Sequence, residues 1–221
     1  MPREQFHAEL TSLQDSFLEM GAMVDRQIER STQSLIERDI SLADAVVRDD
    51  EEVNRRRYEL DNQALLLLAQ QAPMASDLRV IISVLSMVID LERMGDHAKG
   101  IGAIVQMMAG KPLVKPLVDI PEMSRQARAM LNDALDAFVK RDVEAAYRVG
   151  KADDGVDELQ NRVYTDLVEI MIKDPTTVEP CTHLLWVSHN LERIADRATN
   201  IAERVIFTVT GELAEMDVST Y

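Results

Sequence analysis

The stretch DLERMGDHAKGI, residues 90–101, recurs one hundred positions later as NLERIADRATNI, residues 190–201. In each copy a Glu is followed four residues later by an Asp, inside a segment rich in apolar residues. On an α-helix this spacing places both carboxylates on one face. Two like charges so placed oppose the helix by about 0.2–0.5 kcal/mol when exposed, and the cost grows with burial. A repeated acid pair of this kind therefore predicts a cationic partner.

The similarity between the two halves extends beyond these stretches. ERDISLADAVV (37–47) aligns with KRDVEAAYRVG (140–150). At the same spacing, Asp50 and Asn54 align with Asp153 and Asp157. A duplication explains these matched motifs better than chance does, so we expect two similar halves.

Apolar residues recur mostly at three- and four-residue steps, which is typical of helices buried on one face. Asp39, Pro73, Pro175 and Gly211 mark breaks between such segments. We predict six helices. Three lie in the first half, over residues 3–37, over residues 42–71 and over a third segment that Ser76 or Asp77 caps and that ends near 109. The other three cover residues 121–140, 143–172 and 181–210.

GKPLVKPLVDIP (110–121) holds three prolines and one glycine in twelve residues, which indicates a linker. Long helices with short connections pack as antiparallel bundles. The sequence therefore predicts an all-α fold of two tandem, pseudo-repeated three-helix bundles. The expected boundaries are 1–110 for the first bundle, 111–120 for the linker and 121–221 for the second bundle.

The formal net charge of the 221 residues is −15. Such a surface repels phosphate backbones and anionic lipids, so we expect no nucleic-acid partner. The run 78–108 contains six charged residues, so we expect no membrane insertion. One cysteine and an N-terminus without an apolar signal segment agree with a cytoplasmic location.

The acid pairs predict metal sites. If neighbouring helices bring their pairs face to face, the second half gathers four carboxylates and the first half three carboxylates and one amide. Oxygen-rich clusters favour divalent or trivalent cations such as Mg, Mn, Ca, Fe and Zn, and four carboxylates carry more charge than one divalent ion neutralises. The predicted ligands are Asp153, Asp157, Glu192 and Asp196 in the second half, and Asp50, Asn54, Glu92 and Asp96 in the first.

Other interpretations remain open. A single acid pair is common on solvated helix faces, and Arg93 and Arg193 could neutralise the neighbouring acids. A metal-dependent oxidase or phosphatase is one alternative, although the Glu-x-x-His spacing of di-iron bundles is absent at both copies. A purely structural helical scaffold is another. We assign no catalytic residue.

The remaining candidate residues receive structural roles. We expect His183 and His189 to be structural or surface residues and His97 to support a metal site indirectly. We expect Trp186 to pack in the core and Cys181 to be a structural cysteine at the start of a helix.

The sequence resembles the PhoU family, the accessory regulators of bacterial phosphate uptake. The resemblance implies two three-helix bundles and multinuclear metal clusters, with iron or zinc in some members and manganese or magnesium in others. It also implies negative regulation of phosphate uptake through contacts with the transporter's ATPase and a sensor histidine kinase. The residues that carry the resemblance are ASDLRVIISVL (75–85), DLERMGDHAKGI (90–101), NLERIADRATNIAERV (190–205), DDEEVN (49–54) and ADDGVD (152–157).

The first half departs from this pattern. Asn54 stands where an acid is expected, and Lys99 stands where the second copy has Thr199. Gly100 and Ala103 likewise replace a polar and an acidic residue of the second copy. We therefore expect metal to be held best in the second half. Paired bundles with apolar faces also favour a homodimer.

Overall fold

The structure is a computed structural model that describes residues 2–70 and 73–216. Over these residues the chain forms six α-helices and one short 3₁₀ turn, and it contains no strand. The prediction of an all-α fold with six helices is confirmed. The helices are α1 (Pro2–Glu37), α2 (Ile40–Gln70), α3 (Ala75–Met107), α4 (Asp119–Lys140), α5 (Val143–Lys173) and α6 (Val178–Thr210), and the 3₁₀ turn is Pro175–Thr177.

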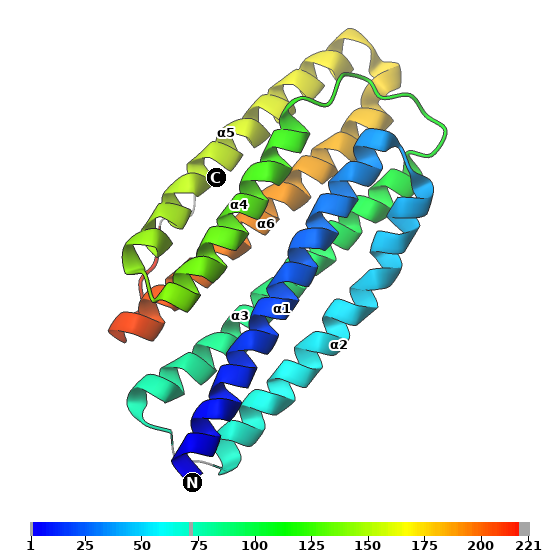
Figure 1. Cartoon of the computed structure of the whole chain (residues 1–221). Helices are drawn as coiled ribbons and strands as arrows, with labels where there is room; N and C mark the ends of the chain where they lie inside the picture. Colours follow the sequence, from blue (N-terminus) through cyan, green and yellow to red (C-terminus); the bar gives the residue numbers. More distant parts are fainter. Residues whose placement is uncertain (1, 71–72, 217–221) are drawn as a thin grey trace.

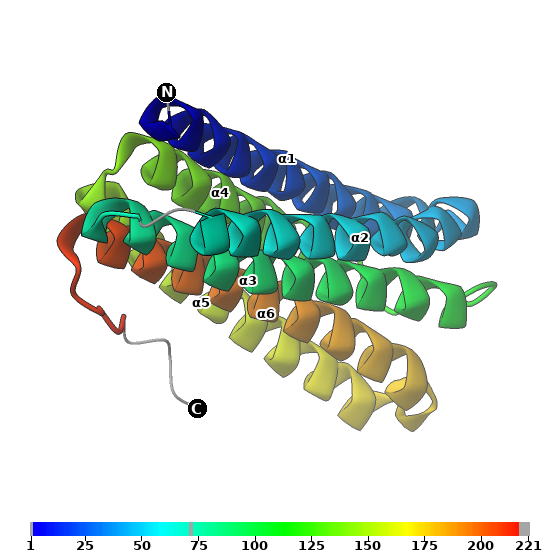
Figure 2. The same cartoon turned by 90° about the horizontal axis from the view of Figure 1, so that it is seen from below.

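The helices form two three-helix bundles that lie side by side along their length (Figure 1). Helices α1–α3 make the first bundle and α4–α6 the second, and Figure 2 shows all six axes running lengthwise through the molecule. The bundles meet mainly through α3 and α6, with a second contact between α1 and α4. The acid-containing stretches 90–101 and 190–201 therefore lie on the two central helices.

One continuous apolar core runs through both bundles. The apolar face of α1 is buried; its members are Leu10, Leu13, Phe17, Met20, Val24, Ile28 and Leu35. Each large apolar side chain buried in this way contributes about 1.5–3 kcal/mol. The shared core holds the two halves together, and the boundaries at 110 and 120 stay a prediction.

The helix ends follow the local sequence in two of the predicted places. Asp39 accepts a hydrogen bond from the Leu42 backbone N–H at 3.0 Å, which caps α2. Gly211 ends α6 with a φ of 81°, a left-handed conformation that glycine adopts without strain. The prediction that Ser76 or Asp77 caps the third helix is wrong, because α3 begins at Ala75 with Met74 at its N-cap.

The sixth helix begins earlier than predicted. The Asp174 side chain accepts from the Thr176 backbone N–H at 3.0 Å and caps the 3₁₀ turn, which leads directly into α6 at Val178. Cys181 consequently lies inside the helix and is fully buried, so its predicted place at a helix start is wrong. The thiol packs in the core, which agrees with a structural cysteine.

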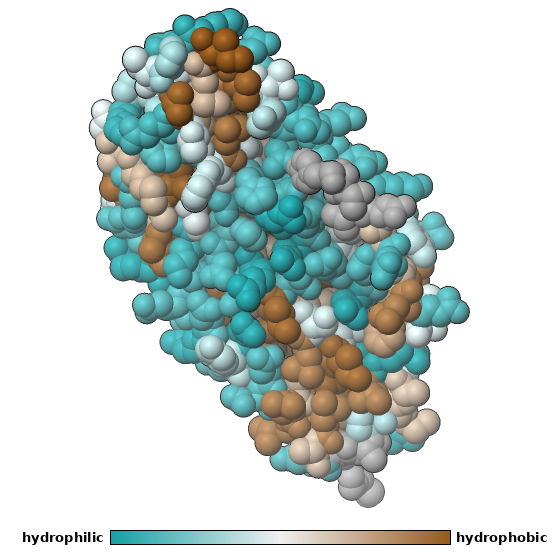
Figure 3. All heavy atoms as spheres, turned by 180° about the vertical axis from the view of Figure 1, so that it is seen from behind, coloured by the Kyte–Doolittle hydropathy of each residue, from teal (hydrophilic) through white to brown (hydrophobic). Residues whose placement is uncertain are grey.

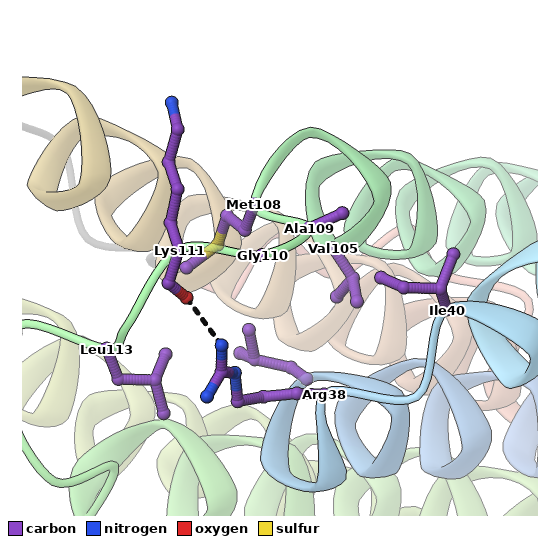
Figure 4. Close-up of a pocket in the computed structure, with 9 residues that line it drawn as sticks. Arg38, Ile40, Val105, Met108, Ala109, Gly110, Lys111 and Leu113 are labelled. Carbon is purple, nitrogen blue, oxygen red and sulfur yellow. Dashed lines mark hydrogen bonds between the residues drawn. The ribbon is translucent and has the colours of Figure 1, made fainter.

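The connection between α3 and α4 is tied to the first bundle. Arg38 donates a hydrogen bond from Nη2 to the Lys111 backbone carbonyl at 2.8 Å (Figure 4). Beside this contact lies a cavity of about 100 Å³, lined chiefly by apolar residues at the ends of α1 and α3, at the start of α2 and in the segment that follows α3. None of the residues that line the cavity belongs to the acid pairs.

Apolar side chains are also found on the surface. On the face seen in Figure 3 they gather toward both ends, with hydrophilic residues over the middle. Trp186 is 64% exposed, so the prediction that it packs in the core is wrong. Among the described residues, no helix is long and apolar enough to cross a membrane.

Candidate metal centre

The second-half cluster lies between α5 and α6. Asp153 and Asp157 project from α5, and Glu192 and Asp196 project from α6, each pair one helical turn apart. The side chains of Asp153 and Glu192 are almost completely buried, with exposed fractions of 4% and 2%. The prediction that these acids face each other across neighbouring helices agrees with the electrostatics described next.

Burial and mutual repulsion change the acidity of the second-half cluster. Burial raises the pKa of Asp153 to about 7, and the charges of Asp196 and Asp157 add to the rise. Burial also raises the pKa of Glu192 to about 7, again with a contribution from Asp196. The pKa of Asp196 is raised as well, mainly by burial. Metal binding to these acids would therefore compete with protons near neutral pH.

Two buried oxygen atoms of this cluster lack a hydrogen-bond partner: Oδ1 of Asp153 and Oε2 of Glu192. Buried polar atoms are nearly always partnered. Arg193 is shared, because its Nε lies 3.1 Å from Glu192 Oε2 and its Nη1 lies 2.8 Å from Asp196 Oδ2. The first of these contacts is an ion pair without hydrogen-bond alignment. An all-oxygen donor set with unpartnered buried atoms fits a hard cation.

The side chains do not surround one ion position as they stand. Among the residues that the structure describes, no group of three or more His, Cys, Asp or Glu is arranged to hold a metal ion. Coordination would therefore require rotation of the carboxylates toward a common point. Such a rotation is local, because all four residues already lie on the facing sides of α5 and α6.

In the first-half cluster, Asp50 is enclosed by hydrogen-bond donors. The side chain of Asp50 is almost completely buried. It accepts hydrogen bonds from Gln27 Nε2 at 3.3 Å, from Asn54 Nδ2 at 3.0 Å and from Lys99 Nζ at 2.9 Å. The hydrogen bond to Asp50 is also the main reason why the pKa of Lys99 is raised. Both oxygens of Asp50 are therefore occupied by donors.

The other first-half acids also have basic partners. Arg57 Nη1 lies 3.1 Å from Glu92 Oε1. Arg93 lies 3.6 Å from Glu92 and 3.4 Å from Asp96. Glu92 Oε2 lacks an aligned hydrogen bond, as its counterpart in the second half does. Three carboxylates thus face three basic side chains, and this donor set fits a metal ion less well than the second-half cluster.

A family model described as PhoU domain matches the chain twice, over residues 17–105 and 120–205. The chain belongs to the PhoU domain family. The two matches each include one acid-containing stretch, so the resemblance inferred from those stretches is confirmed.

Curated PhoU relatives match almost the entire chain. A protein of Clostridium acetobutylicum, named as a phosphate-specific transport system accessory protein PhoU homolog, is 35% identical over 218 residues, which cover 98% of this chain and 100% of the relative. A protein of Pseudomonas putida with the same name is 37% identical over 209 residues, covering 94% of this chain and 82% of the relative.

Solved PhoU structures share the fold. The crystal structure of PhoU from Pseudomonas aeruginosa matches with a TM-score of 0.89 and 35% identity, covering 94% of this chain and 100% of that one. The crystal structure of the phosphate transport system regulatory protein PhoU from Streptococcus pneumoniae matches with a TM-score of 0.89 and 30% identity, covering 95% of this chain and 99% of that one. The prediction of two three-helix bundles is confirmed.

In this member of the PhoU domain family, polar residues of the repeated stretches also pair across the interface between α3 and α6. His97 Nδ1 lies 2.9 Å from Asn190 Oδ1, and Asp90 lies 3.3 Å from Arg197 and 3.1 Å from Asn200. Burial lowers the pKa of His97 and raises that of Asp90. His97 therefore makes its hydrogen bond between the bundles, and its predicted indirect role at a metal site stays a prediction.

Sequence reasoning missed several residues at the edges of the clusters. His189 Nδ1 lies 3.4 Å from Glu192 Oε2, and its position three residues before Glu192 was the available signal. The contact of Arg57 with Glu92 joins two helices, so helical spacing could not reveal it. Burial lowers the pKa of His189, which favours the neutral imidazole.

Proposed function

We propose that this PhoU-family chain is a metal-binding regulator of phosphate homeostasis. It reduces phosphate uptake and phosphate-starvation signalling through the phosphate ABC transporter's ATPase subunit and its sensor histidine kinase. The observation that carries the metal-binding part is the pair of buried carboxylate oxygens, on Asp153 and Glu192, that lack a hydrogen-bond partner. The regulatory part is supported by relatives that are named as accessory proteins of phosphate-specific transport.

The second-half cluster is the proposed metal centre. Asp153 and Asp157 would hold ions from α5, and Glu192 and Asp196 would hold them from α6. Bound Fe, Zn, Mn or Mg ions would neutralise the buried charge and join the two helices, and four carboxylates can accommodate more than one ion. A regulatory role, in preference to a catalytic one, is supported by the related structure that is named as a phosphate transport system regulatory protein.

A groove beside this centre supports protein contacts. It has a volume of about 560 Å³, lies between α5 and α6, and includes the exposed aromatic side chains of Tyr164 and Trp186. His189 and Arg193 line the groove and also contact Glu192. A partner seated there would be sensitive to metal binding, because Arg193 connects the groove to the acids.

We also propose a cytoplasmic homodimer. Exposed apolar side chains on α2 and α3, among them Leu65, Leu66, Ile82 and Ile89, support a contact with a second copy. Light scattering of the purified chain tests this directly. A monomer at micromolar concentration would contradict the proposal.

Elemental mass spectrometry of protein purified without chelator tests the metal centre. The variant Asp153→Asn with Glu192→Gln is expected to lose the bound metal. A matched control is Asp154→Asn with Glu158→Gln, which removes two exposed acids of the same helix and should keep the metal. Equal metal content in both variants would show that the centre is assigned wrongly.

The regulatory role is tested in cells. Deletion of the gene is expected to raise phosphate uptake and to activate phosphate-starvation genes when phosphate is abundant. Re-expression of the native chain should restore both, and unchanged uptake after deletion would contradict the proposal. Assays of metal-loaded protein with phosphate esters and with dioxygen should give no turnover, which separates regulation from catalysis.

A further inference from the structure

The two clusters differ at the positions that supply positive charge. Arg57 on α2 and Lys99 on α3 contact acids of the first half. The spacing that aligns Asp50 with Asp153 aligns Arg57 with Gln160, and the aligned LER stretches place Thr199 opposite Lys99. Both cations are thus replaced by neutral side chains in the second half.

Arg93 and Arg193 occupy the same aligned position and behave alike. Each lies on the helix of its own Glu-x-x-x-Asp pair and bridges the two acids. The difference in charge therefore comes from the other two positions. At the positions of Arg57, Arg93 and Lys99 the first half has three basic side chains, and the second half has Arg193 alone. Arg197, which aligns with His97, adds a further positive charge near Asp196.

The first-half cations also occupy the space around the acids. Lys99 Nζ lies 2.9 Å from Asp50 Oδ2, within the distance of a charge-assisted hydrogen bond. Arg57 reaches from α2, where its Nη1 lies 3.1 Å from Glu92 Oε1. A metal ion that bound these acids would compete with both groups and would lie beside two positive charges.

We propose that the first-half cluster is closed to metal in this chain, because Lys99 and Arg57 take the place of the ion. The Asn54 side chain adds to this arrangement, because its Nδ2 donates a hydrogen bond to Asp50 Oδ2 at 3.0 Å. A metal ligand at this position would instead present an oxygen lone pair. The part of the inference that confines metal to the second half rests on the proposed function. The exclusion of metal from the first half does not.

Measurement of bound metal per chain in a set of variants tests this inference. In the Asp153→Asn, Glu192→Gln background, the first half is expected to hold no metal. Conversion of the first half to the residues of the second, by Asn54→Asp, Arg57→Gln and Lys99→Thr in the same background, is expected to create binding of at least one ion. A folded converted chain that gains no metal would overturn the inference.

The reverse exchange serves as the matched variant. Gln160→Arg in the otherwise native chain places a cation beside the second-half acids and is expected to reduce metal binding at least tenfold. Circular dichroism shows whether each variant folds. If the converted chain does not fold, metal binding by the Gln160→Arg variant tests the inference instead. Unchanged binding in a folded Gln160→Arg variant would count against the inference.

The outcomes separate this inference from the proposed function. Native protein that binds no metal would overturn the proposed metal centre, while the converted chain would still show whether the first-half cations exclude metal. Suppose that the Asp153→Asn, Glu192→Gln variant still binds metal, and that adding Asp50→Asn removes it. This result would overturn the inference, and a metal-binding function would remain supported.

Discussion

The two acid clusters occupy equivalent places in the two bundles but are balanced differently. In the first, Lys99 and Arg57 reach in from neighbouring positions and pair with Asp50 and Glu92. In the second, Asp153 keeps an oxygen without a partner. The same helical frame therefore holds one cluster with a basic partner for each carboxylate and one in which Glu192 and Asp196 share Arg193.

This difference teaches how a duplicated fold can divide its roles. Burying a carboxylate costs free energy unless a charge partner is present. The first half supplies these charge partners from its own side chains. In the second half, the proposed metal ions would supply them. Under the proposed function, the second half would respond to the availability of metal and the first half would not.

The largest expected effect is stabilisation by metal. At a free ion concentration about one hundred times the Kd, binding adds about 2.7 kcal/mol, which for a chain of this size corresponds to a rise in melting temperature of about 5–10 °C. Calorimetry with and without chelator measures it. The shift in melting temperature should vanish in Asp153→Asn with Glu192→Gln and should persist in the control, Asp154→Asn with Glu158→Gln. If it persists in the first variant, the second-half cluster is not the metal site, and the proposed difference between the two clusters is wrong.

A somewhat smaller effect is expected for loss of the built-in cation. Lys99→Met leaves the buried Asp50 without its ammonium partner and should cost about 1–3 kcal/mol, measured by denaturant unfolding of chelated protein. The exposed Lys151→Met is the control and should change little. Adding Asp50→Asn to Lys99→Met should recover part of the loss, and no recovery would mean that the pair does not carry the stability.

The pH dependence of the metal-free protein should come partly from the second half. The raised pKa values of Asp153 and Glu192, both about 7, mean that the folded state binds their protons more tightly than the unfolded state. The stability from these protons is present below about pH 4 and is lost as the pH rises through 7. In the presence of chelator, the melting temperature should therefore fall less steeply from pH 5 to 8 for Asp153→Asn with Glu192→Gln than for the native chain. Parallel curves would contradict the assigned pKa shifts.

The smallest effect is expected at the interface between the bundles. Asn190→Ala removes the hydrogen bond with His97 and should cost about 0.5–1.5 kcal/mol. Metal content should stay unchanged, because neither residue belongs to the proposed ligands. A loss of metal in this variant would show that the interface and the second-half cluster are coupled. Unfolding experiments and elemental analysis on the same preparation provide both readings.

Much of the fold was predictable because its signals are local. The period of the apolar residues located six helices, and Asp39 and Gly211 marked two of their ends. The break at Pro175 was predicted, but the start of α6 was placed too late, because the capped 3₁₀ turn leads directly into the helix at Val178. Trp186 was misplaced because an aromatic residue in an apolar helix can lie at the edge of its buried face.

The sequence by itself determined the duplicated frame, the position of each acid on its helix and the excess of negative charge. Only the tertiary structure decided which acids receive a partner. The contacts of Lys99 with Asp50 and of Arg57 with Glu92 cross from one helix to another. They depend on the rotation and offset of packed helices and on the reach of long side chains, and the helical period of a single segment contains neither.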